Sequence, residues 1–324
     1  VLAIGVTPDT VLAKEAGLEL GIKESIVVND RMETSVPDIY AAGDAVQVKH
    51  YVTGNDALIS LAGPANKQGR IIADNISGGD SRYLGSQGSS VIKVFDMTAA
   101  TTGINETNAQ KSGLEVDTVI LSPMSHAGYY PGGKVMTMKV VFEKESYRLL
   151  GAQIIGYEGV DKRIDVLATA IHAGLNATQL KDLDLAYAPP YSSAKDPVNM
   201  AGFMIDNIAK GTLKQWHLED MDKISKDKDV VLLDVRTVGE FSRGHIDGFK
   251  NIPVDELRER ISEIEKGKPV YLICQSGLRS YIASRILEGN GYETYNFSGG
   301  FRFYDAVVND RALIERAYAC GMDY

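Results

Sequence analysis

Residues 270–279 carry the sequence VYLICQSGLR, and this stretch decides the fold that we predict for the last third of the chain. The four apolar residues predict a buried strand, and helical spacing follows the loop at about 279–289. Cys274 therefore stands at the carboxyl end of a strand, where open α/β sheets place their ligands. Backbone amides of a tight loop and the start of a helix stabilise negative charge. We expect Cys274 to be a largely ionised nucleophile.

Further motifs on both sides of this loop stand in the order and spacing of one family. They are Leu233-Asp234-Val235-Arg236, Glu240-Phe241, Gly244-His245-Ile246, Gly248, Asn251-Ile252-Pro253 and Gly299-Gly300-Phe301. Strands predicted at 230–235, 270–274 and 293–297 complete a small parallel α/β layout. Residues 217–324 therefore resemble the rhodanese family of sulfurtransferases.

The rhodanese resemblance implies that Cys274 carries sulfur as a persulfide, with Arg279 closing the loop or holding the anionic end of a sulfur donor. It also implies that the loop binds the sulfur substrate through Gln275, Ser276, Gly277 and Leu278. Four residues separate Cys274 from Arg279, whereas the related cysteine-based phosphatases have a longer loop that surrounds a phosphate. The shorter loop favours sulfur transfer over phosphate hydrolysis.

Three alternatives concern this region. The His-Ile stretch is structural in rhodaneses, so we expect His245 to be structural rather than catalytic. Cys320 lies four residues from the C-terminus, and we interpret it as a spare thiol rather than a resolving cysteine. The whole domain could also be a docking module without catalysis. The intact loop from Cys274 to Arg279 argues against that, because docking does not require a thiol.

A second group of motifs lies near the start of the chain. The stretch TSVPDIYAAGD, residues 34–44, predicts a strand at Ile39–Ala42 that ends on Gly43, with the Asp44 carboxylate beside it. Gly5-Val6-Thr7-Pro8 precedes this stretch, and a helix beginning near Leu61 follows it. Together these segments resemble the second flavin motif of the FAD-dependent pyridine nucleotide–disulfide reductases.

This second resemblance implies both a cofactor and a fold. The FAD contacts that it implies are Pro8, Gly43, Asp44, Ala62 and Ala65. The N-terminus of the helix would face the flavin ring and stabilise its anionic reduced form. Residues 1–80 are expected to be the C-terminal part of the Rossmann-like NAD/FAD-binding domains.

Residues 87–208 form a second predicted unit. Val91–Phe95 and Val119–Leu121 are expected to be strands on either side of a helix at about 105–112. Val135–Phe142 and Leu149–Tyr157 predict a hairpin, followed by an amphipathic helix at 161–174. The unit resembles the α+β dimerisation domain of the same reductases. That domain lends side chains to the active site of the partner subunit, so a homodimer is implied.

A reductase of this type joined to a C-terminal rhodanese domain (217–324) resembles the coenzyme A disulfide reductase–rhodanese fusions, which include NADH-dependent persulfide and polysulfide reductases. The resemblance implies that Tyr129 and Tyr187 reach the partner's active site, where Tyr187 also contacts the flavin. A phenol there can donate a proton to a leaving thiolate. Tyr130 and Tyr191 are neighbouring rivals for these roles.

Asn66 and Lys195 match positions that contact coenzyme A in this group of enzymes. A lysine is a suitable phosphate partner, although an exposed, solvated lysine is the alternative for Lys195. The net charge of the chain is −9, so nucleic acid is not expected as a partner. An anionic ligand such as coenzyme A therefore needs a local basic site.

The sequence also lacks features that the resemblance requires. No Gly-x-Gly-x-x-Gly occurs, so the FAD and NAD(P)H sites are incomplete. The opening residues 1–7 predict a buried strand whose neighbours lie upstream. We expect a C-terminal part of a larger protein, with the redox cysteine that binds coenzyme A upstream of Val1. The chain has two cysteines and no apolar run of roughly 20 residues, which favours a cytoplasmic location over secretion or membrane insertion.

We therefore predict a homodimeric FAD enzyme that uses NAD(P)H to reduce coenzyme A persulfide, polysulfide or coenzyme A disulfide. Small sulfur donors and thiol acceptors would exchange sulfur with Cys274, and no metal site is predicted. The alternative is an NADH oxidase or peroxidase fused to a rhodanese domain. In that case the upstream cysteine would be oxidised to a sulfenic acid instead of binding coenzyme A.

Overall fold

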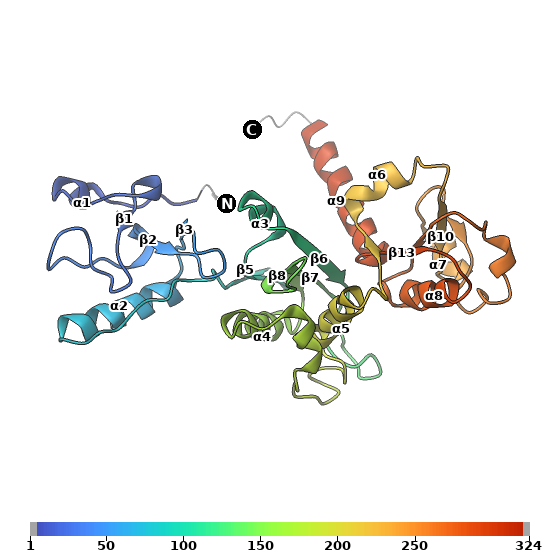
Figure 1. The fold of residues 1–324 in the computed structure, drawn as a ribbon, viewed down its shortest axis with the longest axis horizontal. Helices are drawn as coiled ribbons and strands as arrows, with labels where there is room; N and C mark the ends of the chain where they lie inside the picture. Colours follow the sequence, from blue (N-terminus) through green and yellow to red (C-terminus); the bar gives the residue numbers. More distant parts are fainter. Residues whose placement is uncertain (1–4, 320–324) are drawn as a thin grey trace.

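Three β-sheets follow one another along the chain, each beside its own apolar core. The structure is a computed structural model that describes residues 5–319, with side chains described as far as residue 309. Figure 1 shows the three parts in a row along the longest axis, from the blue segment through the green one to the orange and red one.

The first sheet has three short strands in the order β1-β2-β3. Its elements are α1 (Val11–Glu15), β1 (Ile26–Val27), β2 (Val46–Lys49), β3 (Asp56–Ala57) and α2 (Ala62–Ile76). β1 and β2 run parallel, and β2 and β3 run antiparallel. The core consists of Met32, Val46 and Val48.

One strand prediction in this part is wrong, and another falls mostly on residues 1–4, which lie outside the described residues. Of the strand predicted at 1–7, the described residues 5–7 form no strand, and Val6 is 74% exposed. The strand predicted at Ile39–Ala42 has only an isolated bridge from Tyr40 to Glu33, and the paired strand is β2. An extended segment becomes a strand only where its backbone pairs with a neighbour. Apolar content alone does not decide this.

The second sheet is antiparallel throughout, in the order β4-β5-β8-β7-β6. Its strands are β4 (Ser90–Val94), β5 (Met97–Gly103), β6 (Val116–Leu121), β7 (Met136–Glu143) and β8 (Leu149–Gly156), and its helices are α3 (Glu106–Lys111), α4 (Val160–His172) and α5 (Pro197–Ala209). The predicted hairpin is confirmed as β7 and β8. β5 was not predicted, because its sequence MTAATTG is rich in small and polar residues.

The third sheet is parallel throughout, in the order β11-β10-β12-β13-β9, as predicted for this part of the chain. Its strands are β9 (Gln215–Trp216), β10 (Val231–Asp234), β11 (Lys250–Asn251), β12 (Val270–Ile273) and β13 (Thr294–Phe297). Its helices are α6 (Met221–Ile224), α7 (Val238–Arg243), α8 (Leu278–Glu288) and α9 (Gly300–Ala319). The long helix α9 was not predicted.

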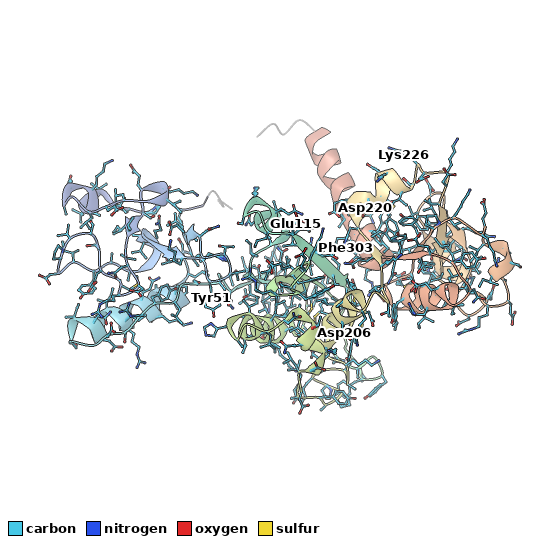
Figure 2. The ribbon with its side chains drawn as sticks, viewed as in Figure 1. Tyr51, Glu115, Asp206, Asp220, Lys226 and Phe303 are labelled. Carbon is cyan, nitrogen blue, oxygen red and sulfur yellow. The ribbon has the colours of Figure 1, made fainter. Side chains whose placement is uncertain are left out.

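Polar contacts join the neighbouring parts. The edge strands β6 and β9 meet where Gln215 Nε2 donates to the carbonyl of Thr118 at 2.7 Å. Between the first two parts, the Tyr51 hydroxyl donates to the carbonyl of His172 at 2.9 Å, and the two rings stack. Figure 2 shows Tyr51 at this junction. Among residues 5–319, no helix combines the length and the apolar character needed to cross a membrane.

Candidate functional site

Cys274 follows β12 directly, and its sulfur atom is enclosed. The residue is 1% exposed. The backbone N–H of Gly277 donates to Sγ at 3.1 Å, and the hydroxyl of Ser280 donates at 3.2 Å. Gly277 has a φ of +102°, which favours glycine, and α8 begins at the next residue. The sulfur is therefore buried but faces two hydrogen-bond donors, as an anionic sulfur requires.

Ser280 is a site residue that our sequence analysis missed. It lies in the first turn of α8 and is fully buried. Its hydroxyl contacts both Cys274 Sγ and the carbonyl oxygen of Gly277, at 3.2 and 3.1 Å. A serine one helical turn after a reactive cysteine loop is the sequence signal that points to this role.

The Cys274 loop rests on the start of α9. The N–H groups of the two residues after Gly300 donate to the carbonyl oxygens of Cys274 and Gln275, at 2.8 and 3.2 Å. Gly300 has a φ of +68°, and a Cβ there would lie 2.7 Å from the backbone nitrogen of Ser276. The glycines that follow β13 in the sequence are therefore needed for the close approach of α9 to the loop.

Arg279 closes the loop by pairing with a carboxylate. Both of its terminal nitrogens donate to Glu240, on α7, at 2.7 Å each. The hydrogen bonds from Arg279, followed by those from Thr237, lower the pKa of Glu240 to about 2. The same pairing raises the pKa of Arg279. Of the two roles predicted for Arg279, the structure shows the one that closes the loop.

A buried ion pair between Arg236 and Asp234 contacts the Cys274 loop. Arg236 donates to both carboxylate oxygens of Asp234, at 2.7 to 3.1 Å, and both side chains are at most 2% exposed. Arg236 also donates to the carbonyl of Gly244 at 2.8 Å and to Gln275 Oε1 at 3.4 Å. Its guanidinium lies 3.8 Å from the ring centroid of Phe301. One cation thus connects the end of β10, the end of α7, the loop and α9.

The other residues predicted for this region differ in exposure. Gln275 and Ser276 are half-buried, whereas Leu278 is 67% exposed at the start of α8. His245 Nδ1 lies 3.1 Å from the carbonyl of Phe241, and its ring stacks on the Phe241 ring. These contacts support a structural role for His245. Cys320 lies outside the described residues.

The two tyrosines predicted to act in reduction lie together. The hydroxyls of Tyr129 and Tyr187 are hydrogen-bonded to each other, although 58 positions separate the residues in the sequence. The bond to Tyr129 raises the pKa of the Tyr187 phenol. The rivals do not join this pair: Tyr130 packs edge-on against His126, and Tyr191 is exposed.

A second buried ion pair holds the segments that carry these tyrosines. Arg163, on α4, donates to both carboxylate oxygens of Asp196 and to the carbonyl of Ser125, at 2.9 to 3.5 Å. Asp196 also accepts from the backbone N–H of Val198 at the start of α5. Ser125 lies shortly before Tyr129 in the sequence, and Asp196 lies shortly after Tyr187. The ion pair therefore fixes the chain next to both tyrosines.

Our sequence analysis also missed Arg163. It lies on the same face of α4 as Val160, Ile164 and Leu167, and all four are buried. A charged residue within the apolar face of an amphipathic helix is the signal that reveals a buried partner.

The residues predicted to contact coenzyme A are exposed and apart from the tyrosine pair. Asn66 donates to the carbonyl of Ala62 within α2, and Lys195 is solvent-exposed. A pocket of about 570 Å³ is lined by Tyr187, Lys162 and Glu158 among others. Within residues 5–309, no hydrogen bond or ion pair connects Asn66, Lys195 and the tyrosines.

One turn and the start of α2 carry Gly43, Asp44, Ala62 and Ala65, which are predicted to bind FAD. Gly43 has a φ of +85°, and its N–H donates to Gln68 Oε1 at 2.7 Å, which ties the turn to α2. A Cβ on Gly43 would lie 3.9 Å from that of Ala65, and α2 begins at Ala62. Asp44 is exposed, and within residues 5–309 its carboxylate makes no hydrogen bond or ion pair. Pro8 is half-buried and lies far from Gly43 in the sequence.

Three regions of the chain match known protein families. Residues 1–69 match the pyridine nucleotide-disulphide oxidoreductases, and residues 89–197 match the dimerisation domain of these enzymes. Residues 217–306 match the rhodanese-like domain. The first two matches contain the Gly43–Asp44 turn and the tyrosine pair, and the third contains the Cys274 loop.

Individual relatives combine the same parts. The chain is 38% identical over 198 residues to the NAD(P)H sulfur oxidoreductase (CoA-dependent) of Pyrococcus abyssi, covering 61% of this chain and 44% of the relative. The reduced CoADR-RHD structure of Bacillus anthracis superposes with a TM-score of 0.92 at 48% identity, covering 96% of this chain and 56% of the other. A NAD-dependent persulfide reductase from A. fulgidus superposes with a TM-score of 0.85 at 42% identity, covering 93% and 55%.

These matches agree with the geometry of the two sites. The chain spans about half the length of the relatives it matches. Its first two parts carry the Gly43–Asp44 turn and the tyrosine pair, and its third part carries a cysteine loop at the end of a parallel strand. The chain therefore carries domains of the pyridine nucleotide-disulphide oxidoreductases, followed by a rhodanese-like domain.

Proposed function

We propose that the protein is an FAD-dependent NAD(P)H oxidoreductase that reduces coenzyme A persulfide, polysulfide or coenzyme A disulfide, coupled to sulfur transfer through Cys274. The observation that carries this proposal is the pair of hydrogen bonds from Gly277 and Ser280 to the buried Sγ. A sulfur in an ordinary apolar core has no need of two donors. Two relatives support the reductase activity, because their names combine coenzyme A with sulfur, polysulfide or persulfide reduction.

The sulfur-transfer step is a displacement at sulfur. The Cys274 thiolate attacks the outer sulfur of a donor R–S–SH, the donor S–S bond breaks, and R–S⁻ leaves. Cys274 then carries –S–SH, and no outside oxidant is needed. An acceptor thiolate reverses the step by attacking that outer sulfur. Gly277 and Ser280 stabilise the anionic Cys274 sulfur before it accepts the extra sulfur and again after it has passed that sulfur on.

The turn at Gly43 fits an FAD cofactor. The Asp44 carboxylate is exposed and unpaired within residues 5–309, so it is available to accept hydrogen bonds from cofactor hydroxyls. Ala62 places the N-terminus of α2 beside it, where a helix stabilises negative charge. The bound cofactor would pass two electrons from NAD(P)H to the sulfur substrate. Pro8, Gly43, Asp44, Ala62 and Ala65 would hold it.

The tyrosine pair would supply protons for the reduction. Cleavage of R–S–SH by NAD(P)H and one proton gives R–SH, H₂S and NAD(P)⁺. A tyrosine phenol is protonated at neutral pH, and the bond to Tyr129 raises the pKa of Tyr187 further. Its hydroxyl can therefore protonate a leaving thiolate. Asn66 and Lys195 are proposed to contact coenzyme A.

We propose that the protein acts as a homodimer in which the tyrosines serve the partner's site. The dimerisation-domain match supports this. The edge of the second sheet also exposes Val91, Ile92 and Val94, and Phe95 is 94% exposed. An apolar strip of this kind at a sheet edge is typical of an interface. The family matches support the proposed domain boundaries 1–80, 87–208 and 217–324. The cytoplasmic location stays a prediction.

Sulfur transfer is tested with a Cys274→Ser variant. Full activity with thiosulfate or polysulfide as donor in this variant would eliminate the assignment. We expect the variant to lose transfer while it keeps NAD(P)H-dependent reduction of coenzyme A disulfide. Mass spectrometry of the donor-treated wild-type protein should show one added sulfur on the peptide that contains Cys274.

The NADH oxidase or peroxidase alternative makes a different prediction for the reductase half. It requires rapid NADH oxidation by oxygen or peroxide without coenzyme A. We expect the protein to oxidise NAD(P)H with coenzyme A disulfide or persulfide far faster than with oxygen. Faster turnover with oxygen would favour the alternative.

A further inference from the structure

A pocket of about 350 Å³ opens beside the Cys274 loop. Gln275 of the loop, Glu240 and Arg243 of α7, and Arg302 of α9 contribute to its lining. Gln275 directly follows Cys274, and its carbonyl oxygen accepts from the N–H of Arg302 at 3.2 Å. The pocket therefore lies within reach of a molecule whose sulfur is reacting at Cys274.

The charges nearest the loop are cancelled in pairs. Arg236 is neutralised by Asp234 at 2.7 Å, and Arg279 is neutralised by Glu240 at 2.7 Å. The pKa of Glu240 is lowered to about 2 by Arg279, so the second pair stays ionised at any physiological pH. Neither cation has a free charge to offer a small anion at the loop.

The outer side of the pocket has a different charge balance. Within residues 5–309, no carboxylate oxygen lies within 4.0 Å of the guanidinium nitrogens of Arg243 or Arg302. Asp305 also lines the pocket, and its Oδ1 accepts from Asn309 at 3.2 Å. Two unpaired guanidinium groups thus face one carboxylate in a chain whose net charge is −9.

We propose that this pocket is a phosphate subsite that binds the anionic end of a phosphorylated thiol or persulfide, of which coenzyme A persulfide is one, through Arg243 and Arg302. The inference rests on the proposed sulfur transfer at Cys274 and names its substrate class. Guanidinium groups bind phosphate oxygens through paired N–H donors. The uncharged thiol arm of such a molecule lies along the side of the pocket where Arg236 and Arg279 are paired with carboxylates, and its outer sulfur reaches Cys274.

The same charge distribution disfavours a compact dianion. Thiosulfate carries its charge within one bond of the sulfur that is transferred, so the charge would lie at the loop. Arg279 is already occupied by Glu240 there. Binding a dianion beside that pair gives no new charge compensation. The protein is therefore selective for a sulfur carrier whose charge lies away from the reacting atom.

The test compares two donors that share the same thiol arm. Coenzyme A persulfide carries phosphates, and pantetheine persulfide carries none. Sulfur transfer to cyanide is measured as thiocyanate, with the rate in Cys274→Ser subtracted as background. In Arg243→Gln/Arg302→Gln we expect the KM for coenzyme A persulfide to rise about tenfold, while kcat and the values for pantetheine persulfide stay unchanged.

Arg258→Gln is the matched control. Arg258 is exposed in the same domain, lines a different pocket, and its replacement removes one positive charge, as each single arginine variant does. We expect this variant to behave as wild type with both donors. Asp305→Asn provides a change of opposite sign, and it should lower the KM for coenzyme A persulfide by about twofold.

The outcomes separate failure of the subsite from failure of the proposed function. If transfer from both donors depends on Cys274 but the two arginine substitutions change both KM values equally or neither, the subsite is wrong and sulfur transfer stands. If Cys274→Ser transfers sulfur as fast as wild type, the proposed function fails. A selective loss of coenzyme A persulfide affinity in the double variant, and in each single variant to a smaller extent, supports the proposal.

Discussion

The Cys274 loop and the Tyr129–Tyr187 pair are each held in place by a buried ion pair, but they differ in how far the rest of the chain surrounds their reactive atoms. Each depends on a buried Arg–Asp pair, Arg236–Asp234 in the first case and Arg163–Asp196 in the second, with side chains at most 3% exposed. Arg236 also donates to the side chain of Gln275 in the Cys274 loop, and Arg163 donates to the backbone carbonyl of Ser125, which precedes Tyr129.

The two sites differ in what surrounds the reactive atoms. Cys274 is 1% exposed, and both hydrogen-bond donors to its sulfur come from the same loop and helix. Tyr129 is 75% exposed, and its hydroxyl contacts only the other tyrosine among the described residues. A buried ion pair can thus preorganise a site for two purposes. It can complete a site within one chain, or it can present groups to another surface.

Removing either buried carboxylate charge should give the largest effect. Asp234→Asn and Asp196→Asn each leave a buried guanidinium without its counter-charge, which costs about 3–5 kcal/mol in the free energy of unfolding. We expect Asp234→Asn to reduce sulfur transfer selectively and Asp196→Asn to reduce NAD(P)H-dependent reduction selectively. Denaturant unfolding and the two activity assays measure these effects.

Asp222→Asn is the control for these two variants, because Asp222 is exposed and unpaired among the described residues. Its stability should lie within about 0.5 kcal/mol of wild type. If a buried-pair variant matched this control, or if either variant reduced both activities to the same extent, the two pairs would not act as separate supports.

Tyr187→Phe should have the next largest effect. It removes the phenol proton and should lower kcat of the reductase about a hundredfold, since general acid catalysis contributes on this scale. Sulfur transfer at Cys274 should not change. Tyr130→Phe should leave both activities as in wild type, because Tyr130 lies outside the pair. Equal losses in both variants would contradict the assignment of Tyr187.

The pair can also be tested through pH. The hydrogen bond that Tyr187 makes to Tyr129 raises the pKa of the Tyr187 phenol, so Tyr187 keeps its proton to a higher pH. Tyr129→Phe removes this bond. The decline of reductase activity at alkaline pH should then begin at a lower pH than in wild type, as measured by a pH profile of kcat. An unchanged profile would show that the phenol does not supply the proton.

Ser280→Ala should reduce sulfur transfer by about tenfold, because a hydrogen bond to a charged group is lost. Ser284→Ala is the matched control on the same helix. Ser284 is also buried, but its hydroxyl donates to the carbonyl of Tyr281 instead of the sulfur. Alkylation of Cys274 at neutral pH should slow in the first variant only. Equal rates in the two variants would remove Ser280 from the site.

Glu240→Gln should give the smallest effect, a loss of about 1 kcal/mol in the free energy of unfolding, because its ion pair is partly exposed. The folded-state pKa of Glu240 is lowered from 4.5 to about 2. The stabilisation is therefore complete above pH 4.5 and is lost as the pH falls towards 2. The difference in the free energy of unfolding between wild type and Glu240→Gln should therefore be constant above pH 4.5 and shrink as the pH falls towards 2. Glu259→Gln, at an exposed position, should show no such dependence.

The parts of the fold that were predictable share a strong local pattern. β10 and β12 contain continuous apolar runs, β13 combines aromatic and β-branched residues, and the turn between β7 and β8 has a clear charged signal. β5 was missed because its apolar pattern is weak, although it pairs with both neighbouring strands. The segment Ile39–Ala42 was predicted as a strand from its apolar pattern, but it makes only one isolated bridge, at Tyr40.

The site residues divide in the same way. Cys274, Gly277 and Arg279 lie in one continuous motif, so their chemistry can be predicted from their order. Ser280 and Arg163 were missed, because their roles depend on contacts made after the chain has folded.

The order of residues was sufficient to predict the parallel sheet and to place Cys274 at the end of one of its strands. It also led to the predictions that Cys274 is a nucleophile and that the Gly43–Asp44 turn binds FAD. Each of these depends on neighbouring residues and their local backbone geometry. Only the tertiary structure decided that Arg279 is paired with Glu240, that Tyr129 meets Tyr187, and that Arg243 and Arg302 share a pocket without counter-charges. Side-chain electrostatics act over a few ångströms in space, and separation along the chain does not determine that distance.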